Sequence, residues 1–116
     1  MARGDVVLID LPSPVAKPGH EQTGFRPAVV VQADADDASL RTQVIVPFTS
    51  QPGALRFPHT IPVNPSQANG LTLPSFLLVS QLRAIDKGRI RNKIGHLEPH
   101  HLDQLNTEIA RLLELP

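Results

Sequence analysis

The chain is 116 residues long, carries no formal net charge and contains no cysteine. This length allows one hydrophobic core but not two, and the lack of cysteine excludes disulfides, thiol chemistry and cysteine-ligated zinc. No apolar run approaches the roughly 20 residues of a membrane-spanning helix and the first residues do not follow the order of a secretory signal, so we expect one cytoplasmic domain over residues 1–116, without membrane contact.

Apolar runs predict three strands in the first half of the chain, at residues 5–11, 26–32 and 40–48. Prolines and glycines mark residues 11–24 as a loop between the first two strands. The second strand is apolar on both faces, so we expect it at the centre of a sheet. An acidic turn at 33–39 follows it, and the second and third strands are therefore expected to pair as a long hairpin.

Two more strands are predicted in the second half of the chain. The strand at 57–63 contains prolines, which cannot donate to a sheet ladder, so it belongs at a sheet edge. A longer strand is expected at 75–85, followed by a tight turn at 86–88 and a short extended segment at 89–97. The twelve prolines of the chain favour this arrangement of short strands over long helices.

A single amphipathic helix is predicted at the end of the chain. Apolar residues recur at three- and four-residue spacing from Leu102 to Leu113, and Pro99 suits a first helical turn. The elements together predict a mainly β fold, with strands over about 3–97 and a C-terminal helix over about 99–114, arranged as a small, partly open β-barrel. Such a barrel leaves sheet edges that a second copy can cover, so we expect a homodimer.

Arg26 stands where a polar, glycine-punctuated segment meets the second predicted strand. The proline after it holds the Arg26 backbone extended, which fixes a planar, permanently charged fork at the beginning of the strand. A fork of this shape is suited to binding a phosphate or a carboxylate.

The third predicted strand ends in PFTSQ, which supplies Thr49, Ser50 and Gln51. If the second and third strands pair through the acidic turn, the beginning of one lies beside the end of the other. Arg26 and Thr49 would then flank one shallow site. Three further polar residues on the fifth predicted strand either add donors to this site or face water: Ser80, Gln81 and Arg83.

Five of the eleven basic residues fall in one short stretch: Arg83, Lys87, Arg89, Arg91 and Lys93. This cluster is either a local anion site or a strand edge kept soluble by charge. Among the histidines, His20 lies in the loop before Arg26 and could reach the site. The other four have no metal-ligand spacing, so we expect no metal ion and no cofactor.

Five segments, in this order, resemble the MazF/PemK family of bacterial toxin endoribonucleases: RGDVVLIDL, GHEQTGFRPAVVV, VIVPFTSQ, SFLLVSQLRAIDKGRI and KIGHL. The most specific feature is the run from Glu21 to Pro27, followed about twenty residues later by a proline-x-threonine element. The resemblance implies an SH3-like barrel, a homodimer, a MazE-like antitoxin partner, and metal-independent cleavage of single-stranded RNA to 2′,3′-cyclic phosphate and 5′-hydroxyl ends.

The resemblance also implies roles for individual residues, with Arg26 and Thr49 as the catalytic pair. His20 stands where some relatives carry serine, so it either adds an acid or base or changes substrate contacts. Bases could stack on Phe25 and Phe57, and on the guanidinium planes of the arginines between 83 and 91. Because aromatic rings are scarce in this chain, we expect base contacts to depend on hydrogen bonds from loops. The full set expected to support the site or contact RNA is His20, Glu21, Gln22, Phe25, Ser50, Gln51, Gln81, Arg83, Lys87 and Arg89.

The main alternative with the same architecture is a CcdB-like toxin that binds gyrase and has no nuclease activity. That class lacks the arginine–threonine pair and ends in an aromatic-bearing tail, whereas this chain has the pair and ends RLLELP. An SH3-like adaptor for proline-rich peptides would need an aromatic groove, and the chain has four phenylalanines and no tryptophan or tyrosine. An inactive homologue retained for binding also stays open.

Overall fold

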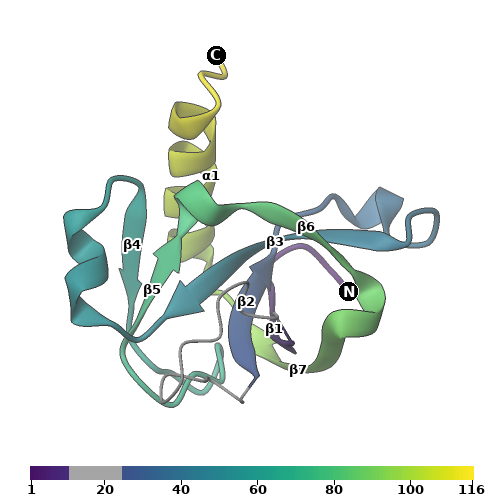
Figure 1. Cartoon of the computed structure of the whole chain (residues 1–116), viewed down its shortest axis with the longest axis horizontal. Coiled ribbons are helices and arrows are strands. Elements are labelled where there is room, and N and C mark those ends of the chain that lie inside the picture. The colour runs from purple at the N-terminus through teal and green to yellow at the C-terminus, as the bar shows by residue number, and fades with distance from the viewer. Residues whose placement is uncertain (11–24) are drawn as a thin grey trace, which may run out of the picture.

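The computed structural model describes residues 1–10 and 25–116 (Figure 1). Its strands are β1 Asp5–Ile9, β2 Arg26–Val30, β3 Thr42–Thr49, β4 Thr60–Val63, β5 Ser75–Leu78, β6 Arg83–Asp86 and β7 Ile90–His96. Short 3₁₀ turns separate several of them, and the helix α1 Pro99–Leu112 closes the chain. A mainly β fold with a C-terminal helix is therefore confirmed, and within the described residues no helix is long and apolar enough to cross a membrane.

The sheet is antiparallel, with strand order β4-β5-β3-β2-β1-β7. The long strand β3 organises it, because β2 pairs with residues 45–47 of β3 while β6 pairs with residues 42–45 and β5 with residues 48–49. The hairpin predicted between the second and third strands is confirmed. The strand predicted at 57–63 was expected at a sheet edge. This is also confirmed, since β4 is the last strand at one end of the strand order.

The core occupies both faces of the sheet. Alternate residues of one strand point to opposite faces, so Val6 packs with Val29 on one face while Val7 packs with Val30 on the other. All four are fully buried, which explains why these strands read as continuous apolar runs. On the first face, α1 inserts the fully buried Leu105, and its partly buried neighbours Leu102, Ile109 and Leu112 pack against the same cluster.

The segment predicted as one strand at 75–85 is instead two strands, and that prediction was wrong. A 3₁₀ turn, Val79–Gln81, separates β5 from β6, so both can pair with different halves of β3. The Val79 N–H donates to the His59 carbonyl and the Leu82 N–H donates to the Val79 carbonyl, which takes the backbone out of the ladder. Residues 75–85 contain neither glycine nor proline, so no turn signal in the sequence revealed it.

Several predicted boundaries also differ. β4 begins at Thr60 rather than at residue 57, because His59 adopts a left-handed backbone with φ of 60°. The predicted tight turn at 86–88 is a 3₁₀ turn over Lys87–Arg89 in which the Asp86 side chain accepts from the Gly88 N–H. Leu113 was expected on the buried helical face, but α1 ends at Leu112 and Leu113 is 53% exposed.

Candidate active site

Arg26 is the first residue of β2 and Thr49 is the last residue of β3. The ladder between these strands ends at the pair Ala28 and Pro47, so Arg26 and Thr49 each lie two residues beyond it, at the same end of the hairpin. Arg26 pairs there with Ile9 of β1, and Thr49 pairs with Phe76 of β5. In agreement with this, both are partly exposed and both line one cavity of about 440 Å³.

The cavity is lined by both apolar and polar residues. Leu8, Pro27, Phe48 and Ile94 contribute apolar surface, while Arg26, Thr49 and several other hydroxyl groups contribute the polar surface. Its far wall is the segment from Gly70 to Leu73, together with Ser75. The wall is fixed closely against β7, since a Cβ added at Gly70 would overlap the Ile94 carbonyl, and Gly70 has a φ of 71° that favours glycine.

Thr49 also lines a second hollow, of about 240 Å³. This second hollow brings together Thr49, Gln51 and Gln81 with the exposed ring of Phe57, and its other lining residues are Ala54, Leu78 and Ser80. Ser50 lies in the first cavity. Each hollow thus has one exposed phenylalanine, Phe25 in the first and Phe57 in the second. A ligand that extended across both would pass over Thr49.

The five basic residues between 83 and 93 do not line this cavity together. Lys87 lies at a separate hollow with Met1, where it donates to the Asp37 carbonyl and pairs with the Asp37 carboxylate at 3.6 Å. Arg89 donates to the Asp10 carbonyl at 3.4 Å. Arg83 is exposed on β6, opposite residue 45 of β3. These positions favour the interpretation of a charged strand edge for most of the cluster.

Two other basic residues of the cluster have clear partners. Arg91 pairs with Asp10 at 3.5 Å, and its guanidinium carbon lies 5.6 Å from the centre of the Phe25 ring, at the rim of the cavity. Lys93 pairs with the buried Asp5 at 3.1 Å, and His96 also contacts Asp5 at 3.0 Å. Burial would raise the pKa of the Asp5 carboxyl, but hydrogen bonds from His96, the Ala2 N–H and Lys93 outweigh it and lower that pKa.

Comparison with known proteins places this geometry in a family. Residues 2–113 match the family described as PemK-like, MazF-like toxin of type II toxin-antitoxin system. The chain is 34% identical over 113 residues to Endoribonuclease EndoA of Bacillus subtilis, covering 97% of this chain and 94% of that protein. It is 33% identical over 109 residues to Endoribonuclease MazF of Staphylococcus saprophyticus, covering 94% and 88%.

The chain belongs to the PemK-like, MazF-like toxin family. Among solved structures, a MazE–MazF crystal structure from Deinococcus radiodurans superimposes with a TM-score of 0.77 at 21% identity, covering 100% of this chain and 97% of that chain. An endoribonuclease in complex with its cognate antitoxin from Mycobacterial species gives a TM-score of 0.76 at 22% identity, covering 100% and 97%. These similarities confirm the MazF-like fold.

Three residues that the family resemblance assigned to the site, His20, Glu21 and Gln22, lie outside the described residues. The remaining members of the expected set fall into two groups. Arg26, Thr49, Phe25, Ser50, Gln51 and Gln81 line the two adjoining hollows. Arg83, Lys87 and Arg89 line neither.

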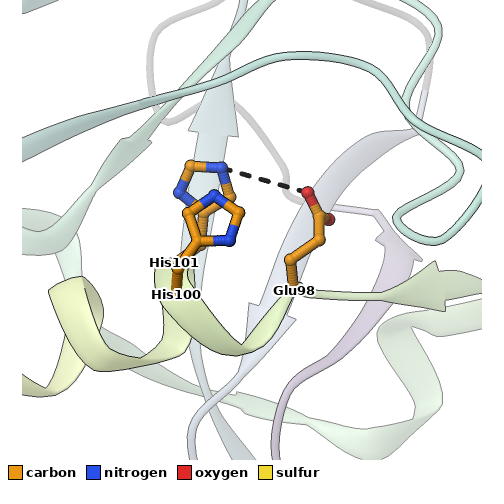
Figure 2. Close-up of side chains that lie close together, drawn as sticks. All are labelled: Glu98, His100 and His101. Atoms are coloured by element: carbon orange, nitrogen blue, oxygen red, sulfur yellow. Dashed lines mark ion pairs between the residues drawn. The ribbon is translucent and has the colours of Figure 1, made fainter.

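One cluster in this MazF-like chain was not predicted from the sequence. Glu98, His100 and His101 bring their ligand atoms within 4.8 Å of one another at the beginning of α1 (Figure 2). The spacing between histidines alone does not include the glutamate. The signal that could have revealed it is the Glu-Pro-His-His run at the beginning of an amphipathic helix.

Proposed function

We propose that this chain is the toxin of a toxin–antitoxin module and acts as an endoribonuclease on single-stranded RNA. The observation that carries the proposal is the shared cavity of Arg26 and Thr49 at the ends of two paired strands. Family membership and the two relatives named endoribonucleases support the same reaction. The match to this family also argues against the CcdB-like alternative.

Arg26 and Thr49 have complementary donors for a scissile phosphate. The guanidinium offers two parallel N–H groups, which match two phosphoryl oxygens. The Thr49 Oγ1 accepts a hydrogen bond from the Gln51 N–H at 3.3 Å. Because that contact uses an oxygen lone pair, the hydroxyl hydrogen is left to donate to the phosphate. The two residues would therefore stabilise the charge that develops on the phosphoryl oxygens.

The reaction forms a bond between the ribose 2′ oxygen and phosphorus while the bond from phosphorus to the 5′ oxygen breaks. The 2′-hydroxyl loses its proton, and the departing 5′ oxygen gains one, which gives a 2′,3′-cyclic phosphate and a 5′-hydroxyl. No metal ion enters this scheme. A guanidinium keeps its protons near neutral pH, so we assign Arg26 to charge stabilisation. In this scheme Glu21 orients Arg26, and water or His20 carries the protons.

The substrate strand would extend across both hollows. Phe25 and Phe57 would each stack a base, because aromatic faces bind bases without requiring one sequence. Gln51 and Gln81 would hydrogen-bond base edges, which single strands leave accessible. Arg83, Lys87 and Arg89 would contact only RNA that continues beyond the two hollows.

The same surface would also bind an inhibitor. We infer a MazE-like antitoxin whose acidic and apolar segment occupies the RNA site and imitates phosphates, and a toxin that acts as a cytoplasmic homodimer. Support comes from the MazE–MazF crystal structure from Deinococcus radiodurans.

End mapping of cleaved RNA tests the proposal. The purified chain is incubated with a mixed RNA in the presence of a chelator, and new 5′ ends are sequenced. We expect cleavage at a short recurring sequence with 5′-hydroxyl ends. Arg26→Gln should reduce the rate by roughly two to three powers of ten, whereas Arg111→Gln, an exposed arginine on α1, should not. Equal rates for both variants would contradict the proposal.

A further inference from the structure

The cluster at the beginning of α1 has the donor types and spacing of a metal site (Figure 2). The Glu98 Oε2 lies 3.9 Å from the His101 Nε2. This separation is too long for a hydrogen bond. Zinc bonds to carboxylate oxygen and imidazole nitrogen are each about 2.0–2.2 Å long, so a tetrahedral ion bound to both atoms would draw them together by about 0.5 Å. His100 completes the group, with its ring centre 4.0 Å from that of His101.

Hydrogen bonds from two side chains hold the Glu98 carboxylate in its orientation. Its Oε1 accepts hydrogen bonds from the Asn69 side-chain amide at 3.0 Å and from the Ser66 hydroxyl at 3.4 Å. Asn69 is fully buried, and its own oxygen accepts from the backbone N–H groups of Ser66 and Leu71. The Asn69 amide also lies 3.5 Å from the Glu98 Oε2, and this second oxygen faces His101.

The His101 ring is oriented in a similar way. Its Nδ1 lies 2.8 Å from the Gln104 Oε1. An amide oxygen only accepts, so the Nδ1 carries the hydrogen and the Nε2 presents its lone pair toward Glu98. Metal-binding histidines usually have such a partner on the second ring nitrogen, and it fixes the tautomer and the ring orientation. His101 is largely covered, while His100 is exposed and gives an ion access.

We propose that Glu98, His100 and His101 bind a divalent transition metal ion, with Zn²⁺ the ion that best matches two imidazoles and a carboxylate. Water would complete the coordination. None of the three residues lines the two hollows described above, so the ion would act structurally. It would connect the beginning of α1, through Glu98 and Asn69, to the segment that continues into the Gly70–Leu73 wall of the cavity.

Zinc titration of the untagged, metal-free chain tests the site. We expect calorimetry to show one saturable Zn²⁺ per chain and Tm to rise on addition of Zn²⁺, with no rise for Mg²⁺, which prefers oxygen ligands. His101→Ala, His100→Ala and Glu98→Gln should each abolish the saturable binding. Gln104→Ala removes only the hydrogen-bond partner of His101, so it should weaken the affinity by roughly 10- to 100-fold.

His59→Asn is the matched control. His59, just before β4, pairs with Glu108 of α1, away from the proposed site. Asparagine tolerates the left-handed backbone of this position, so the substitution should not change zinc affinity. Wild-type affinity in the His101 and Glu98 variants, or an equal loss in the His59 variant, would overturn the proposal. Glu98→Gln keeps the size and the acceptor of the glutamate, so retained circular dichroism separates lost binding from lost folding. RNA cleavage in chelator should proceed in all these variants, which keeps this test independent of the proposed nuclease activity.

Discussion

At the scale of single residues, Thr49 is the residue that both hollows share. Thr49→Val keeps the shape and the strand propensity of threonine and removes only the hydroxyl. We expect single-turnover RNA cleavage to fall by about two powers of ten, with urea stability nearly unchanged. Thr107→Val is the matched control, because the Thr107 hydroxyl donates to the Asp103 carbonyl on the exposed side of α1. Full activity in the Thr49 variant would remove the hydroxyl from the reaction.

Asp5 makes stability depend on pH. Its pKa is lowered from 3.8 in the folded chain, so the stabilisation it supplies is complete above 3.8 and is lost as pH falls through the lowered pKa. Asp5→Asn should lower the free energy of unfolding by about 1–3 kcal/mol at pH 7, because His96 and Lys93 lose a charged acceptor. The difference in unfolding free energy between the wild type and this variant should become smaller when urea unfolding is measured below pH 3.8.

Asp103→Asn provides the comparison for this measurement, since Asp103 is exposed on α1. It should change stability little at either pH. A cost for Asp5→Asn that stayed constant down to strongly acidic pH would show that packing, and not charge, accounts for the effect of Asp5.

At the scale of elements, the Gly70–Leu73 wall depends on the close approach of Gly70 to β7. Gly70→Ala introduces a side chain at a φ of 71° and an overlap with the Ile94 carbonyl. We expect the free energy of unfolding, measured in urea, to fall by at least about 2 kcal/mol. RNA cleavage should also be reduced. Gly53→Ala is the control, because its Cβ would meet only the flexible Arg56 side chain at 3.3 Å. Unchanged stability of the Gly70 variant would contradict this account of the wall.

The elements that could be predicted from sequence are those with a local signal. The hairpin of β2 and β3 follows from two apolar runs around an acidic turn, and α1 follows from its leucine spacing. The turn at Val79–Gln81 could not be predicted, since it depends on the carbonyl of His59, a residue distant in sequence. Arg26 and Thr49 were expected together because hairpin connectivity alone brings their strand ends together. Glu98 was not connected with His101, because side-chain direction at the beginning of a helix is not visible in spacing.

At the scale of the whole molecule, substrate and antitoxin are expected to compete for one surface. Rising amounts of an acidic, apolar antitoxin segment should raise the KM for RNA and leave kcat unchanged, because only free toxin binds RNA. Steady-state cleavage of a short fluorogenic RNA measures both constants. A fall in kcat at constant KM would place the antitoxin elsewhere. A scrambled segment of equal charge serves as the control, because it has the same bulk electrostatic attraction to the toxin, which weakens with salt. It should not raise the KM as the antitoxin segment does.

The pairing pattern of β3 has a consequence for how such a toxin could be silenced. Arg26 belongs to the ladder of β2, whereas Thr49 is held by β5, which pairs with β4. Arg26 and Thr49 are therefore positioned by different ladders, which meet through β3. A partner that weakened the pairing of β5 with the end of β3 would displace Thr49 while Arg26 kept its place.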